Sequence, residues 1–418
     1  MSFASTGLCP ALLDAVEQRG YAAPTGIQAT AIPAILRGGD VLGQAQTGSG
    51  KTAAFVLPVL QQLLATHRAT PRQLRALIVV PTRELAAQVG ETVRGFAQSL
   101  EVPVKTVTVF GGVSINPQMM ALRGGADIVV ATPGRLLDLV DHNALRLAGI
   151  ATLVLDEADR LFDLGFADEL QRLLALLPPR RQNLFFSATF PPAVEALANG
   201  VLRQPARLKA EPMPPAQQPA IVQRAIAVDP GRRTQLLRHL IEQGNVRQAL
   251  VFAGSRYTTE LVAHKLSKAG LAAAPLHGEL SQGARTDALA AFKAGGLRVL
   301  VATDLAARGL HIAGLPLVVN YDLPRAAVDY VHRIGRTGRA GQEGMAISFV
   351  SAATEAHFRL IEKRQQLRVA REQIAGFEPT EAAVADTTPP LADATGGVKG
   401  RRKSKKDKLR EAAAQGGG

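Results

Sequence analysis

The first residues that could do chemistry form one stretch, Ala45-Gln46-Thr47-Gly48-Ser49-Gly50-Lys51-Thr52. An apolar segment precedes it and an apolar helical pattern follows it, which is the strand–loop–helix setting of a phosphate-binding loop. Its glycines let backbone N–H groups turn inward around a phosphate. Lys51 is expected to reach the β- and γ-phosphates, and the Thr52 hydroxyl to hold Mg²⁺. One position departs from the general pattern, because Ala45 stands where the first glycine is usual.

A second group of candidate residues begins with Asp156 and Glu157, which follow the apolar run 152–155. An acidic residue at the tip of an apolar strand is where such nucleotide-binding proteins position Mg²⁺. The adjacent Glu157 could orient and deprotonate an attacking water. The alternative is an ordinary helix start, where acidic residues are favoured by the helix dipole. Together with Lys51 and Thr52, the pair favours nucleoside triphosphate hydrolysis.

A third group lies in the run from His332 to Arg339, which holds four cations or potential cations in eight residues. Arginines spaced three apart around glycines suit bidentate contacts to phosphate oxygens. We expect Arg336 and Arg339 to act as arginine fingers on a phosphate that the first half of the chain holds. A solvated basic loop is the alternative.

Two series of short apolar runs must position these residues. Their β-branched composition and the helical patterns between them predict an α/β fold, with parallel sheets covered on both faces. The carboxyl ends of the first series carry polar residues, so we expect them to meet at one sheet edge. The runs are 76–80, 107–110, 127–130, 152–155 and 183–186, then 249–252, 272–276, 298–301, 316–319 and 345–349. The second series has no phosphate loop, which predicts one nucleotide site shared by two similar domains.

The domain organisation follows from these series and from two breaks in the pattern. Four prolines in the region 209–219 predict a linker between a first domain, 1–208, and a second domain, 220–378. Beyond residue 378 the apolar periodicity fails, which predicts a disordered tail over 379–418. Its run 399–410 has eight basic residues and one acidic residue, a net charge of +7 that favours loose nucleic-acid binding over a mere solubility role.

The composition of the chain indicates the class of its binding partner and the cellular compartment in which it works. A net charge of +13 indicates that the partner is a polyanion. An aromatic content of 4% without tryptophan argues against a nucleic-acid-binding face that relies on base stacking. We therefore expect contacts to phosphates and sugars, with little sequence preference. No apolar run is long enough for a membrane span, and no secretory signal is recognisable. A single cysteine, Cys9, excludes an internal disulfide, so a cytoplasmic setting is expected.

In their order along the chain, these motifs resemble the DEAD-box family of ATP-dependent RNA helicases, and the likeness covers roughly residues 1–375. Residues 156–159 match the motif that names the family, and 20–28 resemble its adenine-reading Q motif, with Phe3 as the upstream aromatic. The remaining matches are 81–86, 132–135, 187–189, Gln282-x-x-Arg285, 302–309 and 332–339. The short N-terminus and basic tail are similar to bacterial RhlE-type members. Ala45 is usual in this family.

The resemblance implies two tandem RecA-like domains, with nucleotide and RNA bound at the inter-domain cleft, and ATP and Mg²⁺ as cofactors. It implies that Tyr21 and Gln28 hold adenine; an amide such as Gln28 also matches the edge of adenine chemically, although a surface glutamine is usually without such a role. The implied RNA contacts are Thr82, Arg83, Gly112, Thr132, Arg135, Gln282, Arg285 and Thr303. The implied coupling residues are Asp159, Ser187, Thr189 and His332.

Two positions depart from the family pattern. His311 stands where the family has an aspartate that resembles a ribose contact, and Gly26 stands where an apolar residue or proline is frequent. The resulting prediction is an RNA-dependent ATPase that separates short RNA duplexes or remodels RNA–protein complexes. An ATP-gated RNA clamp or assembly factor is the alternative, and a DNA translocase is a third. Ribosomal or RNA-decay proteins are candidate partners.

Overall fold

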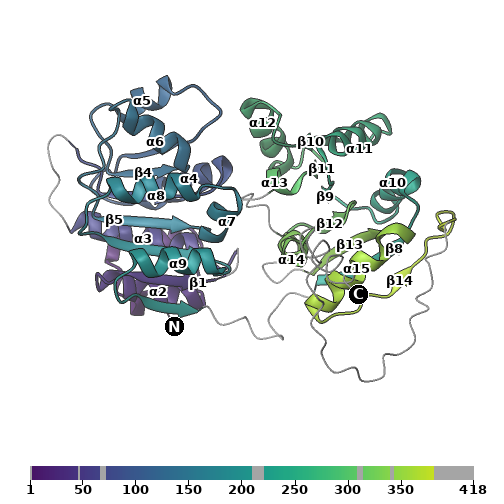
Figure 1. Ribbon diagram of the computed structural model, residues 1–418, viewed down its shortest axis with the longest axis horizontal. Helices are drawn as coiled ribbons and strands as arrows, with labels where there is room; N and C mark the ends of the chain where they lie inside the picture. The colour runs from purple at the N-terminus through teal and green to yellow at the C-terminus, as the bar shows by residue number, and fades with distance from the viewer. Residues whose placement is uncertain are drawn as a thin grey trace, which may run out of the picture. The chain divides into compact units, whose positions relative to one another are not determined.

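The computed structural model describes residues 2–45, 48–65, 72–209, 221–307, 314–338 and 343–380. Residues 1–381 group into one compact unit. Within it we call residues 2–209 the N-lobe and residues 221–380 the C-lobe; each lobe contains one seven-stranded sheet, and the strand pairs in both are parallel (Figure 1). In the part of the chain that the structure describes, no helix combines the length and apolarity that a membrane crossing needs.

The N-lobe sheet has the strand order β3-β4-β2-β5-β6-β1-β7. Its central strands are fully buried, as the continuous apolar runs predict, whereas the edge strand β7 is half exposed. The strands are β1 (Val41–Gln44), β2 (Ala76–Val79), β3 (Thr106–Val109), β4 (Ile128–Ala131), β5 (Thr152–Asp156), β6 (Gln182–Ser187) and β7 (Ala206–Lys209).

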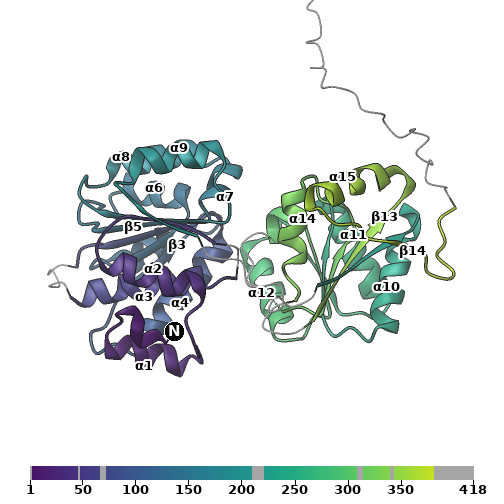
Figure 2. The ribbon, with the colours of Figure 1, turned by 90° about the horizontal axis from the view of Figure 1, so that it is seen from below.

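Helices cover both faces of this sheet, and Figure 2 shows the two layers. One face carries α1 (Pro10–Gln18), α2 (Gly26–Leu36), α3 (Lys51–Leu64) and α4 (Arg83–Ala97), preceded by the 3-10 turn η1 (Phe3–Thr6). The other carries α5 (Asn116–Leu122), α6 (Pro133–Asp141), α7 (Ala158–Asp163), α8 (Ala167–Leu176) and α9 (Pro192–Val201).

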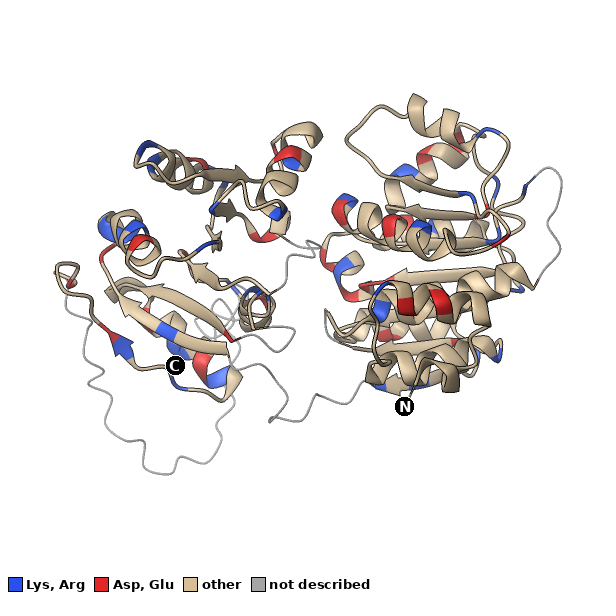
Figure 3. Ribbon diagram, turned by 180° about the vertical axis from the view of Figure 1, so that it is seen from behind, with Lys and Arg blue, Asp and Glu red and all other residues tan. Residues whose placement is uncertain are grey.

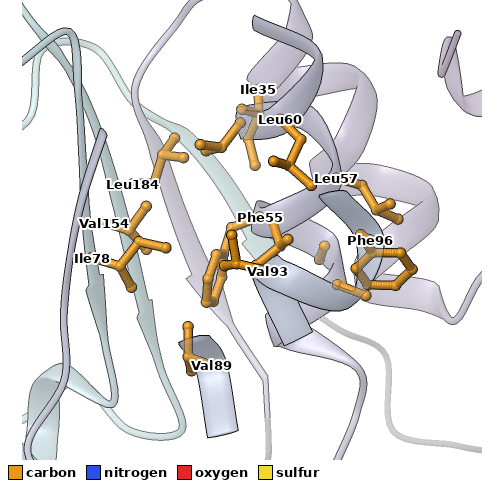
Figure 4. Packing of buried hydrophobic residues seen from close by; sticks show 14 of the residues in the cluster. Ile35, Phe55, Leu57, Leu60, Ile78, Val89, Val93, Phe96, Val154 and Leu184 are labelled. Atoms are coloured by element: carbon orange, nitrogen blue, oxygen red, sulfur yellow. The ribbon is translucent and has the colours of Figure 1, made fainter. Parts of the chain in front are cut away.

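The N-lobe core fixes the helix that follows the phosphate loop. Phe55 of α3 packs 5.4 Å, ring to ring, from Phe186 of β6. Figure 4 shows Phe55 and Leu60 among residues of α4 and of the neighbouring strands. Because α3 is held on two sides, its first turn has a fixed position at the end of β1.

The C-lobe repeats the same topology. Its order, β10-β11-β9-β12-β13-β8-β14, becomes that of the N-lobe when β8 is counted as the first strand. The strands are β8 (Ile221–Ala227), β9 (Ala249–Phe252), β10 (Ala273–Leu276), β11 (Val299–Ala302), β12 (Leu317–Asn320), β13 (Gly344–Val350) and β14 (Arg371–Glu372). The predicted α/β class with two similar parallel-sheet domains is confirmed.

Helices also cover both faces of the C-lobe sheet. One face packs on α10 (Arg233–Gln243) and α11 (Arg256–Lys268). The other packs on α12 (Gln282–Lys293), α13 (Asp304–Ala307), α14 (Ala327–Ile334) and α15 (Glu355–Gln365). The short turn η3 (Pro230–Arg232) precedes α10, and η4 (Ala352–Thr354) precedes α15.

The segments predicted as linker and tail fall largely outside the described residues. Lys209 is the last residue of β7, and residues 210–220 are not described. At the other end, Thr380 still bonds to the C-lobe, since its N–H and hydroxyl donate to Asp229 Oδ2 at 2.9 and 2.8 Å. Residues 381–418, which hold the basic run 399–410, are not described.

Candidate functional site

The phosphate loop leads from β1 into the first turn of α3. Gly48 and Gly50 have φ values of 86° and 89°, a left-handed conformation that favours glycine. Lys51 begins α3 and is only 6% exposed, yet its Nζ has no hydrogen-bond partner among the described residues. A buried ammonium without a partner is costly, so the site fits an anion that would bond to it. Gln46 and Thr47 lie outside the described residues.

Asp156 and Glu157 lie beside this loop because β5, β6 and β1 are neighbours in the sheet. Burial raises the pKa of Asp156 to about 6, while nearby Lys51 acts in the opposite direction. Glu157 has a φ of 50°, an unusual conformation for a side-chain-bearing residue, and its Oε2 lies 3.4 Å from Arg160 Nε. A buried carboxylate close to a lysine and a phosphate loop suits a divalent cation.

Asp159 joins the ends of β5 and β6. Its Oδ2 accepts from Thr189 Oγ1 at 2.7 Å and from Thr189 N at 3.0 Å, and its own N–H donates to Ser187 Oγ at 3.1 Å. Burial alone would raise the pKa of Asp159, but the hydroxyls of Thr189 and Ser187 outweigh burial and hold the pKa below its usual value. The three predicted coupling residues of the N-lobe therefore form one bonded group.

Gln28 is bonded within the protein at both ends of its amide. Its Oε1 accepts from Thr25 N at 3.0 Å and its Nε2 donates to Gly50 O at 3.1 Å, while Thr25 Oγ1 donates to Ser49 O at 2.7 Å. The predicted adenine-reading residue thus holds the phosphate loop in this structure. The spacing Thr-x-x-Gln signals the bond to Thr25 from sequence, as a capping box, but nothing local signals the bond to Gly50. Tyr21 packs against Phe3 and Phe96.

The predicted RNA contacts of the N-lobe follow β2, β3 and β4 at one sheet edge. Thr82 caps α4 and Thr132 precedes α6, each at the end of a strand. Gly112, with a φ of 78°, lies against the Arg83 guanidinium, where a Cβ would clash with it. Arg135 donates to Val113 O at 2.7 Å, and its Nη1 has no hydrogen-bond partner among the described residues.

Two predicted RNA contacts of the C-lobe bond to the N-lobe. Arg83 Nη1 donates to Gln282 Oε1 at 3.2 Å, and Arg285 Nη2 lies 2.7 Å from Glu84 Oε1. Burial lowers the pKa of Arg83, and the positive charge of Arg285 adds to that effect. Thr303 follows β11 and begins the turn into α13. The structure therefore brings three of the predicted RNA contacts, Arg83, Gln282 and Arg285, together with Glu84.

The run from His332 to Arg339 divides into residues with different environments. Arg333 is 2% exposed, forms a two-point ion pair with Asp304 at 2.6 Å, and stacks on the Phe252 ring at 4.9 Å. It is therefore a structural residue of the C-lobe. Arg336 is also buried. The predicted second arginine finger, Arg339, lies outside the described residues, as does His311.

His332 of α14 contacts a residue that sequence reasoning missed. Arg160 Nη2 lies 2.9 Å from His332 Nδ1, and burial, with Arg160 next in effect, lowers the pKa of His332 to about 4. The imidazole is therefore neutral at physiological pH and can accept from the guanidinium. The two residues are 172 positions apart, so no local sequence signal could have paired them.

Comparison with known proteins gives two family matches. Residues 25–197 match the DEAD/DEAH box helicase model, and residues 232–341 match the helicase conserved C-terminal domain. The chain is 38% identical over 370 residues to the DEAD-box ATP-dependent RNA helicase CshA of Bacillus cereus, covering 88% of this chain and 69% of that protein. It is 39% identical to the ATP-dependent rRNA helicase rrp3 of Sclerotinia sclerotiorum, covering 90% of this chain and 78% of the relative.

Solved structures agree with these matches. S. cerevisiae Dbp5 bound to RNA and ADP BeF3 aligns with a TM-score of 0.76 at 29% identity, covering 89% of this chain and 95% of that chain. Mss116p bound to ssRNA and AMP-PNP aligns with a TM-score of 0.79 at 28% identity, covering 89% and 78% of the two chains.

Proposed function

The chain belongs to the DEAD-box family of ATP-dependent RNA helicases. On this premise we propose which of its residues bind ATP, which bind RNA and which take part in hydrolysis. The protein is an RNA-dependent ATPase that separates short RNA duplexes or remodels RNA–protein complexes. Residues 1–208 are proposed as the ATP-binding domain, 209–219 as the linker, 220–378 as the second RecA-like domain and 379–418 as the basic tail.

Lys51 and the loop before it bind the triphosphate of ATP. The observation that carries this assignment is the buried Lys51 ammonium, which has no hydrogen-bond partner among the described residues and lies near Asp156. Thr52 and Asp156 would hold Mg²⁺, which supplies positive charge to the phosphates. Glu157 orients the attacking water and accepts its proton. Tyr21 and Gln28 bind adenine, which requires the Gln28 amide to exchange its present bonds to Thr25 and Gly50.

RNA binds along the strand-end residues of both lobes, through phosphates and sugars. Thr82, Gly112 and Thr132 lie at the ends of N-lobe strands, and Thr303 follows a C-lobe strand. Binding there would compete with the bonds that now join Arg83 to Gln282 and Arg285 to Glu84. Arg336 and Arg339 then stabilise charge on the transferring phosphoryl group, a role worth about 10³–10⁵ in turnover in other NTPases.

The decisive experiment measures the ATPase rate with and without RNA for the wild type and for Lys51→Ala. We expect RNA to stimulate the wild type and the variant to lose both the basal and the stimulated rate. An unchanged rate in Lys51→Ala would refute the assignment of the triphosphate site.

A strand-displacement assay separates unwinding from clamping. Unwinding predicts release of a short strand with ATP, whereas an RNA clamp predicts retention of RNA with a non-hydrolysable analogue and little release. Equal ATPase stimulation by DNA and RNA of the same length would favour a DNA translocase, because contacts to the 2′-hydroxyl distinguish the two.

The cellular setting is part of the same proposal. We assign the protein to the bacterial cytoplasm, with ribosomal or RNA-decay proteins as partners. The bacterial source of the CshA relatives supports the bacterial part of this assignment, and the name of rrp3, an rRNA helicase, supports a ribosomal partner. Co-purification of ribosomal particles or of a ribonuclease with the tagged protein would test it.

A further inference from the structure

A group of arginines lies at the sheet edge opposite the candidate site. The strands β6, β1 and β7 are neighbours and parallel, so their amino ends meet at one edge of the N-lobe sheet. Each of these amino ends is preceded closely by arginine. The four residues, which we call the amino-edge arginines, are Arg37, Arg180, Arg181 and Arg203.

The amino-edge arginines form no direct ion pair among the described residues, although the Asp40 carboxylate acts on Arg181. Within the described ranges no ion pair is found for any of the four, although many other arginines are paired (Figure 3 shows both charge types along the ribbon). The carboxylate that the structure places at this edge is Asp40, which is buried. Asp40 accepts from Asn183 N, Asn183 Nδ2 and Arg203 N at 2.7, 3.1 and 2.8 Å. Its oxygens therefore accept from two backbone N–H groups and one side-chain amide, and a single carboxylate faces four guanidinium groups at this edge.

Backbone carbonyls hold two of these guanidinium groups in place. Arg181 Nη1 donates to Pro178 O at 2.7 Å and its Nε donates to Asn183 Oδ1 at 2.9 Å, while Arg203 Nη2 donates to Pro179 O at 2.8 Å. Burial lowers the pKa of Arg181; the Asp40 carboxylate acts against this shift, and the positive charge of Arg203 adds to it. Arg37, Arg180 and Arg203 are exposed. Four like charges at one edge, of which three are exposed and two are held by hydrogen bonds, with one carboxylate among them, favour a multivalent anion.

We propose that the amino-edge arginines form a second RNA-binding surface, which holds the phosphate backbone of RNA that extends beyond the candidate site. The proposal rests on RNA being the substrate of this protein. Guanidinium groups bind phosphates by paired N–H donors, and an arginine cluster of this kind is sequence-independent. The two edges of the sheet are separated by the length of a strand, about 20 Å. A short single strand in the candidate site therefore does not reach this surface, whereas a long or folded RNA does.

The test compares variants that remove two positive charges each. Arg180→Gln/Arg203→Gln removes charge from the proposed surface. Arg37→Gln/Arg180→Gln is a second variant, in which the replaced guanidinium groups make no hydrogen bond among the described residues, so the fold is kept. Lys265→Gln/Lys268→Gln, on the exposed end of α11, is the matched control. The probes are a single-stranded RNA of about five nucleotides, which is about 17 Å long at about 3.4 Å per nucleotide, and a folded RNA of about sixty nucleotides, so that only the second spans the two edges.

We expect both amino-edge variants to lose affinity for the folded RNA, by about eightfold per lost phosphate contact at 0.1 M salt, with a salt slope smaller by about 0.9 per contact. Affinity for the short RNA and the ATPase rate that it stimulates stay at the wild-type level. An unchanged slope with the folded RNA, or an equal loss in the lysine control, overturns the proposal. Poly-glutamate serves as a third probe. If the amino-edge variants lose binding to poly-glutamate but keep RNA binding, the proposal is also overturned, because that result would indicate an acidic protein partner. Loss of short-RNA stimulation in the wild type would instead refute the proposed function.

Discussion

Replacing Thr189 by valine tests the bonded group at the ends of β5 and β6. Valine keeps the shape of threonine but removes the hydroxyl that donates to Asp159 Oδ2 at 2.7 Å. The bond from Thr189 N to the same oxygen, at 3.0 Å, remains. Asp159 is buried but Thr189 is exposed, so water can replace part of the lost bond.

A hydrogen bond to a charged group contributes about 1.5–3 kcal/mol to stability. Because Thr189 is exposed, we expect Thr189→Val to destabilise the N-lobe by an amount at or below the low end of this range, about 1–1.5 kcal/mol at pH 7, and Thr189→Ser, which keeps the hydroxyl, to cost much less. Hydrogen–deuterium exchange in a urea series measures the effect on N-lobe peptides separately from the C-lobe, because the two lobes have separate cores.

The same bond sets a pH dependence. The pKa of Asp159 is lower in the folded protein than in the unfolded chain, so its contribution to stability is present above the unfolded pKa and is lost as the pH falls through the folded pKa. The difference between wild type and Thr189→Val should accordingly be constant near neutral pH and shrink in acid. Equal stability of the valine and serine variants at pH 7, or a difference that grows as the pH falls, would refute this account of the group.

Three further predictions concern the nucleotide site, its loop and the tail. Glu157→Gln should bind ATP and RNA normally but lower turnover by about 10²-fold or more, as measured by single-turnover hydrolysis, and normal turnover would refute its role as base. Gly50→Ala should weaken nucleotide binding in a titration and cost about 1–2 kcal/mol of stability, because φ is 89° and the new Cβ would meet Gln28 Nε2; tolerance of alanine would show that the loop rearranges freely. Truncation after Thr380 should lower RNA affinity and flatten its salt dependence while basal ATPase activity is kept, and an unchanged slope would make the tail a spacer.

The sequence was sufficient to predict those features that depend on local patterns. Buried strands such as β2 and β4 read as continuous apolar runs, and the polar residues after them lie at one edge because parallel strands end there. The strands β7, β8 and β14 were missed. β7 and β14 are edge strands that are partly exposed, and the apolar pattern of β8 is interrupted by Gln223 and Arg224, so none of the three carries a continuous apolar run that would mark it.

The paired side chains of the site were beyond local prediction. Arg333 belongs to a basic run that suggests phosphate binding, yet it is bound to Asp304, 29 positions away. Likewise, the bond from Gln28 to Gly50 depends on how α2 packs beside the loop. Such pairs are decided by tertiary packing, because the sequence shows which groups can bond but not which groups meet.

The buried Lys51 ammonium has a consequence for how long the protein survives in the cell. Since a bound anion would relieve the cost of burying it, nucleotide should favour the folded N-lobe by mass action, by about 2.7 kcal/mol when its concentration is a hundred times the dissociation constant. Proteases cleave chains that have opened. In starved cells, where ATP is scarce, this protein would therefore be degraded faster than in growing cells, and its abundance would follow the energy supply of the cell.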